Sequence, residues 1–341
     1  MSEKGLIYHS KEIKNALYQT LLKRLPPKEF STHLEDLVAI LIDALSEGEL
    51  EINFENTIDQ TKLKSQGWPQ AHKAALIASG WTTGESAPFV LSNNQLSLRR
   101  WHHEMNEVVK SLIYRSNSKR KTFQSTKKRE ALMVPNGLNH EQSAAVQLIE
   151  SEGVVLLSGG PGTGKTSTVM RMLETALSLN SGLKIGLAAP TGKAARRLQD
   201  SLQKGIATIK SPYQKELIRV PCNTLHRWLQ SSPNGFAKNA QKPLDLELLI
   251  IDEMSMVELS LMQALLEALP IRSQLVLVGD PNQLPPIGSG AIWHHLHKEN
   301  IHRYFGKGAV RLHQTYRNRG ELALLSKLLC EQGLNSFWSE I

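Results

Sequence analysis

The apolar side chains in the N-terminal third of the chain recur at helical spacing. Between residues 34 and 45 they fall at i, i+3, i+4 and i+7, which predicts one buried face of an amphipathic helix. The residues of this face are Leu34, Leu37, Val38, Leu41, Ile42 and Leu45. Gly48 follows at the place where a glycine commonly ends a helix.

A short pair of strands is predicted later in the same third of the chain. Residues 89–91 and 95–98 are rich in strand-forming side chains, and Asn93-Asn94 between them is suited to a hairpin turn. No group of residues in this part of the chain has catalytic spacing. We therefore expect residues 1–115 to form a mostly helical accessory or partner-docking domain.

Residues 116–135 interrupt both patterns. Within them, residues 116–129 contain few apolar side chains and two basic runs, 119–121 and 127–129. Such a composition predicts a basic linker or an exposed loop, with contact to DNA phosphates as the less favoured alternative.

From residue 138 onward, short apolar runs alternate with stretches of helical spacing. The runs cover residues 154–158, 185–189, 248–252 and 275–279. Strands that are apolar on both faces belong to parallel sheets covered by helices on each side. The predicted fold of residues 136–341 is therefore α/β.

Composition and charge narrow the class of protein only slightly. The net charge of +8 is compatible with a phosphate-rich partner, because neutralised phosphates release counterions. No apolar run reaches the roughly 18 residues of a membrane span, and the N-terminus lacks the apolar segment of a secretory signal. We therefore expect a cytoplasmic protein without membrane contact. The two cysteines, Cys222 and Cys330, support neither a zinc site nor a disulfide scaffold.

Residues 159–166, Gly-Gly-Pro-Gly-Thr-Gly-Lys-Thr, form a complete phosphate-binding loop between a predicted strand and a predicted helix. The glycines let backbone N–H groups curl around phosphate oxygens, and the helix N-terminus adds a favourable dipole. Lys165 is expected to reach the β- and γ-phosphates of ATP, and the Thr166 hydroxyl to bind Mg²⁺. The predicted nucleotide-binding residues are Gly159, Gly160, Pro161, Gly162, Thr163, Gly164, Lys165, Thr166 and Ser167.

Two further predicted strands end in polar residues suited to phosphoryl chemistry. One ends in Asp252-Glu253, where Asp252 would hold Mg²⁺ and Glu253 would accept a proton from the attacking water. The other leads into Asp280-Pro-Asn-Gln-Leu-Pro-Pro, in which the Gln283 amide could orient water or sense the γ-phosphate. An ATPase in general does not need this long polar segment. The segment therefore indicates a more specialised class of ATPase.

In their order and in their residues, these segments resemble the motifs of superfamily-1 helicases, and of the RecD-like branch in particular. The matching segments are 159–166, 189–198, 224–229, 252–257, the Gln283 loop and 312–318. The resemblance covers about residues 138–320, and more faintly 89–101. It implies a RecA-like P-loop NTPase domain over residues 136–341. Met254 stands where the family has a small residue.

The resemblance also implies roles that the residues alone would not. Gln142 matches a glutamine that binds the adenine edge, and Arg317 matches a motif-IV arginine that contacts the γ-phosphate. The residues implied to face single-stranded DNA are Pro190, Thr191, Lys193, Thr224 and His226. Two alternatives stay open: Thr191 could simply cap a helix, and His226 and Trp228 could belong to the core.

By resemblance, the intact protein would be an ATP-driven 5′-to-3′ DNA helicase subunit of an exodeoxyribonuclease V. It would act on DNA ends with RecB- and RecC-like partners in double-strand-break repair and recombination. We expect the second motor domain to be absent from these 341 residues, and a single domain to bind ATP without unwinding DNA alone. The alternatives are a stand-alone RecD-like or relaxase-type helicase, and a truncated fragment that binds nucleotide or partners without motor activity.

Overall fold

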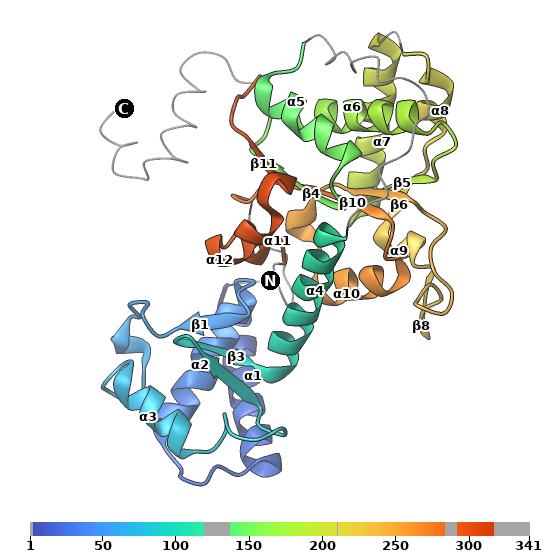
Figure 1. The fold of residues 1–341 in the computed structure, drawn as a ribbon. Coiled ribbons are helices and arrows are strands. Elements are labelled where there is room, and N and C mark those ends of the chain that lie inside the picture. Colours follow the sequence, from blue (N-terminus) through green and yellow to red (C-terminus); the bar gives the residue numbers. More distant parts are fainter. Residues whose placement is uncertain (1–2, 119–136, 210, 284–291, 317–341) are drawn as a thin grey trace, which may run out of the picture. The chain divides into compact units, whose positions relative to one another are not determined.

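The computed structural model describes residues 3–118, 137–209, 211–283 and 292–316, with side chains from residue 12 onward. The chain forms two compact units that divide between Glu107 and Val108 (Figure 1). This division lies inside helix α4 (Arg99–Asn117), upstream of the domain end expected at residue 115. The expected linker, 116–135, lies almost wholly outside the described residues.

The N-terminal unit packs helices against a small antiparallel sheet of order β1-β3-β2. Its elements are α1 (Glu3–Arg24), α2 (Thr32–Ser46), β1 (Glu51–Asn53), η1 (Gln60–Lys62), α3 (Gln70–Ala78), β2 (Phe89–Ser92) and β3 (Gln95–Leu98). The predicted amphipathic helix is confirmed as α2, which buries Leu34, Leu37, Val38 and Leu41. The predicted strand pair is confirmed as β2 and β3. Asn93 and Asn94 join them with φ of 48° and 63°, the positive values that a type I′ hairpin turn requires.

The second unit is built on a parallel sheet of six strands in the order β11-β4-β10-β9-β5-β6. The strands are β4 (Val154–Gly159), β5 (Ile185–Ala189), β6 (Cys222–Thr224), β9 (Leu248–Ile251), β10 (Gln274–Gly279) and β11 (Ala309–Leu312). The four strands expected from the apolar runs are present, and the α/β prediction is confirmed. β6 and β11, which were not predicted, are the two edge strands of the sheet. A separate short hairpin pairs β7 (Ser231–Ser232) with β8 (Gly235–Phe236).

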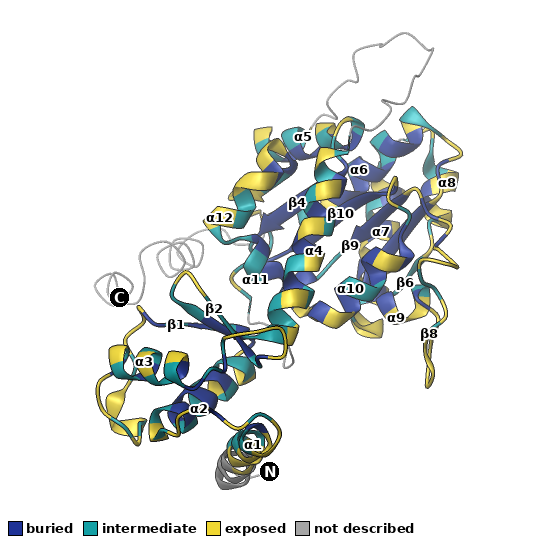
Figure 2. Cartoon of the chain, turned by 60° about the horizontal axis from the view of Figure 1, so that its bottom comes forward, coloured by how far each residue is buried: buried dark blue, intermediate teal, exposed yellow. Residues whose placement is uncertain are grey.

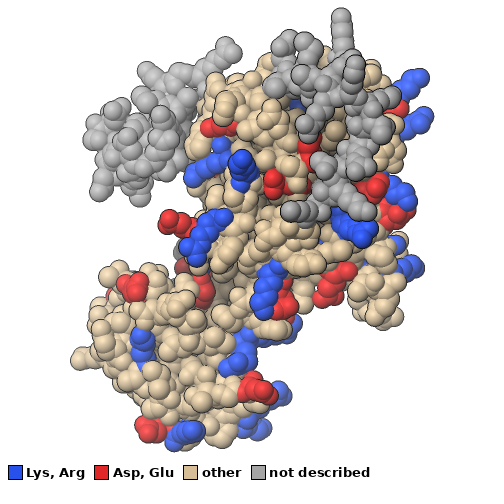
Figure 3. Space-filling model, in the orientation of Figure 1, with Lys and Arg blue, Asp and Glu red and all other residues tan. Residues whose placement is uncertain are grey.

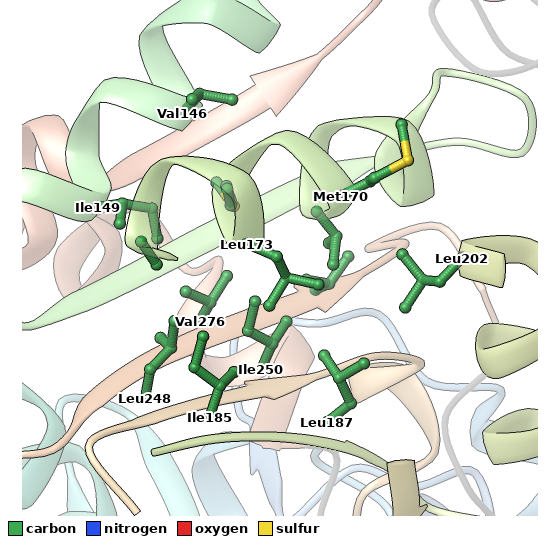
Figure 4. Packing of buried hydrophobic residues seen from close by; sticks show 14 of the residues in the cluster. Val146, Ile149, Met170, Leu173, Ile185, Leu187, Leu202, Leu248, Ile250 and Val276 are labelled. Atoms are coloured by element: carbon green, nitrogen blue, oxygen red, sulfur yellow. The ribbon is translucent and has the colours of Figure 1, made fainter. Parts of the chain in front are cut away.

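Helices cover both faces of this sheet. They are α5 (His140–Gln147), η2 (Leu148–Glu150), α6 (Lys165–Leu179), α7 (Gly192–Thr208), α8 (Gln214–Arg219), α9 (Leu225–Trp228), η3 (Met254–Met256), α10 (Leu259–Ala268), α11 (Ile292–Leu296), α12 (Glu299–His302) and η4 (Arg303–Gly308). Alternate strand residues such as Leu187 and Ile250 join a core with α5 to α8 (Figure 4). The residues between them, such as Leu249, are also buried and point to the other face, where α10 and α11 lie (Figure 2). Within the described ranges, no helix is both long enough and apolar enough to cross a bilayer.

The C-terminal half of α4 is joined to the second unit by a buried arginine. The Arg115 guanidinium donates to the carbonyl oxygens of Leu266, Leu269 and Pro270 at 2.9, 2.6 and 2.8 Å. These carbonyls end α10, and a helix C-terminus lacks internal donors for its last carbonyl groups. Burial lowers the pKa of Arg115 to about 10, so the side chain stays charged at neutral pH and caps the helix dipole.

His297 is held as a neutral imidazole in the segment that follows α11. Its Nδ1–H donates to the Trp293 carbonyl at 2.8 Å, and its ring lies edge-on against the Trp293 indole, 4.4 Å between centroids. Nε2 is buried and has no hydrogen-bond partner among the residues that the structure describes. Burial, helped by the nearby charges of His302 and Arg311, lowers the pKa of His297 to about 4.

This lowered pKa predicts an acid-dependent loss of stability. Between the unfolded value of about 6.5 and the folded value of about 4, the unfolded chain binds a proton that the native chain excludes. The unfolding free energy should therefore fall as the pH falls through this range, by up to about 1.4 kcal/mol per pH unit from this group. Urea unfolding of wild type and His297→Gln at pH 7, 6 and 5 measures the difference. A variant with the wild-type pH slope would contradict the assignment.

Candidate nucleotide-binding site

The phosphate loop occupies the turn between β4 and α6. Gly162 and Gly164 have φ of 78° and 85°, backbone conformations that favour glycine. A Cβ on Gly159 would lie 2.6 Å from the Thr163 hydroxyl, and one on Gly164 would lie 2.4 Å from Gln142 Nε2. Packing therefore favours glycine at 159, and both packing and conformation favour it at 164.

The side chains of the loop are already hydrogen-bonded within it. The Lys165 ammonium donates to the carbonyl oxygens of Gly159 at 2.6 Å and Gly160 at 3.0 Å. The buried Thr163 hydroxyl donates to Gly160 O at 2.9 Å. Thr166 is partly exposed in the first turn of α6. The loop is thus folded around its own lysine, with the helix N-terminus pointing into it.

The acidic pair follows the end of β9 in a strained turn. Glu253 has φ 56° and ψ 46°, a left-handed conformation that is uncommon for a residue with a side chain. Its backbone N–H donates to Asp252 Oδ1 at 2.9 Å. Burial raises the pKa of Asp252 to about 6, assisted by the charge of Glu253 and opposed by that N–H and by the Lys165 ammonium. Asp252 and Lys165 therefore lie within electrostatic reach of each other.

Gln283 follows β10, the strand between the phosphate-loop strand and the acidic-pair strand. Its Oε1 accepts a hydrogen bond from the Ser255 hydroxyl at 2.9 Å. Asp280, 3% exposed, holds the intervening turn by accepting from the Asn282 N–H at 2.9 Å. This turn brings Gln283 to the residues that follow the acidic pair, although 28 positions separate Gln283 from Ser255 in sequence.

Gln142 supports the phosphate loop from α5. Its Oε1 accepts from the Asn139 N–H at 3.1 Å, and its own N–H donates to Asn139 Oδ1 at 2.8 Å, forming a capping box. Its Nε2 donates to the Thr163 carbonyl at 3.2 Å, and the side chain is buried. The contact with adenine that the resemblance implies stays a prediction. The structure adds a role in positioning the loop.

Tyr316 is a further residue at the phosphate loop, and no role for it was predicted from the sequence. The Tyr316 N–H donates to Gly162 O at 2.8 Å, and the 46% exposed ring lies 3.8 Å from where a Cβ on Gly164 would be. An exposed ring at this place offers a nucleobase an apolar face. Glu141 braces the same segment by accepting from His313 N and Nδ1 at 2.8 and 2.7 Å. The neighbouring Arg317 lies outside the described residues.

The residues expected to face DNA lie after β5 and β6. The Thr191 hydroxyl accepts from the Ala194 N–H at 3.2 Å and so caps α7; Pro190 is partly exposed, and Lys193 is exposed next to it. Thr224 caps α9 in the same way, and His226 is exposed. Trp228 instead has a structural role, because its indole N–H donates to Leu187 O at 2.8 Å.

These residues fit a nucleotide with a divalent cation. The loop supplies backbone N–H groups, a lysine and a hydroxyl for phosphates, and Asp252 is a carboxyl group whose burial a nearby cation would compensate. Glu253 adds a second carboxylate on the adjacent residue. Such a set can bind a triphosphate and position a water against it.

Replacing Gln142 with alanine tests its structural role without any nucleotide. The variant loses the capping box and leaves the Thr163 carbonyl without its donor, so the unfolding free energy should fall by about 1–2 kcal/mol. Gln147→Ala, at an exposed position of the same helix, is the matched control. Denaturant unfolding of the nucleotide-free proteins measures both. Equal stability of Gln142→Ala and wild type would leave base contact as the only role.

The chain is similar in sequence to several known proteins. A family model described as an AAA domain, a family that uses nucleotide, matches residues 142–289. The RecBCD enzyme subunit RecD of Mycolicibacterium smegmatis is 34% identical over 275 residues, which cover 76% of this chain and 48% of that protein. The ATP-dependent RecD2 DNA helicase of Deinococcus radiodurans is 41% identical over 154 residues, 45% of this chain and 19% of that protein.

Among solved structures, two coordinating Pif1 helicases on forked duplex DNA match with a TM-score of 0.39 and 22% identity. That match covers 60% of this chain and 50% of the other. The chain spans about half the length of the mycobacterial RecD proteins that it matches. The motif series and the curated relatives together make this chain a RecD-like sequence of helicase superfamily 1.

Proposed function

We propose that this chain carries the first motor domain of an ATP-dependent 5′-to-3′ DNA helicase subunit of a RecBCD-type exodeoxyribonuclease V. It would act in double-strand-break repair and recombination in the cytoplasm, where DNA and ATP are available. The observation that carries the proposal is the order of the sheet. Three strands that neighbour one another end in the phosphate loop, the Gln283 turn and the acidic pair.

Each site residue has a role that follows from its chemistry. Lys165 would exchange its loop carbonyl partners for phosphate oxygens, and Thr166 and Asp252 would hold Mg²⁺. When bound, Mg²⁺ would neutralise charge on the β- and γ-phosphates. Glu253 would accept the proton of the attacking water, and Arg317 would contact the γ-phosphate.

The extent of the matches favours a complex-borne subunit over a stand-alone helicase. The match to the mycobacterial RecBCD subunit covers 76% of the chain, more than residues 108–341 contain, so it extends into the N-terminal unit. The match to the RecD2 helicase covers 45%, which the motor unit alone can contain. We propose RecB- and RecC-like partners on this basis.

DNA contact is proposed through the segments after β5 and β6. The exposed Lys193, beside the N-terminus of α7, and the exposed His226 would meet a phosphate backbone; Pro190, Thr191 and Thr224 would shape the same surface. On the face shown in Figure 3, basic and acidic side chains are interspersed in each unit and form no continuous basic stripe.

Lys165→Ala in the full chain tests the nucleotide site. The substitution removes the charged donor to the phosphates, so affinity for Mg²⁺-ATP should fall at least about 10-fold, the loss expected for one charge-assisted hydrogen bond or more. Lys184→Ala is the matched control, because the Lys184 ammonium pairs with Asp245 on an exposed surface. Isothermal titration calorimetry measures both, and wild-type affinity in Lys165→Ala would contradict the proposal.

Turnover and assembly test the motor role. We expect single-stranded DNA to raise ATP hydrolysis by the wild-type chain above that of Lys165→Ala, and RecB- and RecC-like proteins to co-purify with it. Turnover equal to that of the variant would favour a fragment that only binds nucleotide. Turnover without co-purification would favour a stand-alone helicase.

A further inference from the structure

Ser255 connects the two polar turns of the site through one hydrogen bond. Its side chain is 1% exposed, and its hydroxyl lies 2.9 Å from Gln283 Oε1. Ser255 follows the acidic pair after β9, whereas Gln283 follows β10, the next strand in the sheet. The bond therefore joins the part of the site that holds the proposed base to the part that holds the proposed phosphate sensor.

Both partners are held by their own turns before they meet. The left-handed Glu253 reverses the chain, and the backbone bonds Met256 N to Glu253 O and Val257 N to Met254 O close the 3-10 turn that carries Ser255. Met254 and Val257 are fully buried on either side of it. The turn and the packing thus hold the backbone of Ser255, and its hydroxyl meets Gln283 from this fixed position.

On the other side, the Gln283 backbone is tied to the end of β10. Its N–H donates to Asp280 O at 3.3 Å, and Asp280 is itself buried. The Gln283 side chain still rotates about its own bonds, and rotation of the amide exchanges an acceptor oxygen for a donor NH₂ group at nearly the same place. The hydrogen bond that Ser255 donates to Oε1 favours the arrangement in which the oxygen faces Ser255.

From this contact we infer that Ser255 is a positioning residue that fixes the Gln283 amide with its oxygen inward and its NH₂ group toward the nucleotide. A hydroxyl has one hydrogen to donate, and here the hydrogen is directed at Oε1. The amide can then donate to a γ-phosphate oxygen or to a lone pair of water, but it cannot accept a proton. Proton acceptance is left to Glu253.

The inference rests on the proposed function and refines it. Donors directed at a γ-phosphate oxygen distinguish a triphosphate from a diphosphate, whereas the phosphate loop itself holds both. Ser255 should therefore affect the preference for the triphosphate and leave the affinity for the diphosphate unchanged. A purely structural serine would affect both equally or neither.

The test compares ADP and ATPγS binding, each with Mg²⁺, to the full chain by calorimetry. Ser255→Ala should lower the preference for ATPγS over ADP by about 3- to 10-fold, the value of one hydrogen bond. Its ADP affinity should stay within about 2-fold of wild type, because the phosphate loop is untouched. Ser255→Thr keeps the hydroxyl and should restore the preference. Gln283→Glu keeps the oxygen that faces Ser255 but removes the NH₂ group, so it should lose the preference as Ser255→Ala does.

Ser273→Ala is the matched control. Ser273 is another buried serine, and its hydroxyl donates to Leu246 O at 2.5 Å. Ser273 comes directly before β10, whereas Gln283 follows the other end of this strand. It should keep the wild-type preference. A wild-type preference in Ser255→Ala, an equal loss of ADP and ATPγS affinity, or a wild type without any preference would each overturn the inference. A wild type that binds neither nucleotide would instead overturn the proposed function.

Discussion

The parallel pairing of β10 with β4 on one side and β9 on the other determines where the phosphate loop, the Gln283 turn and the acidic pair lie. Parallel strands end at the same edge of a sheet, so three segments that are distant in sequence meet there. The pairing is stabilised by apolar side chains that are buried on both faces of the sheet. The site thus depends on the packing of a core that contains none of its chemistry.

Much of this arrangement could be predicted from the sequence because its signals are local. The four central strands are continuous apolar runs, and the phosphate loop is a contiguous motif whose glycines meet steric limits at Gly159 and Gly164. The edge strands β6 and β11 escaped prediction because they are short and only partly buried. The structure adds that α4 continues across the division of the two units, upstream of the predicted domain end at residue 115.

The parts of the site that could not be predicted are contacts between distant segments. The bonds from Ser255 to Gln283 and from Tyr316 to Gly162 join residues that no local pattern connects. Gln142 was predicted only through a family resemblance, and its bond to the Thr163 carbonyl had no signal in the sequence. The left-handed Glu253 likewise breaks a local rule. Strain of this kind costs about 1–3 kcal/mol, so the surrounding packing must hold it in place.

The lysine of the phosphate loop has a consequence for selectivity. The Lys165 ammonium donates to the carbonyl oxygens of Gly159 and Gly160, so a ligand that binds this lysine exchanges two hydrogen bonds rather than adding them. A ligand gains only the difference between its own oxygens and these two. A polyphosphate that also reaches the helix N-terminus and the acidic pair would replace these two partners with several new ones, so the internal bonds of Lys165 favour ligands that extend beyond the lysine.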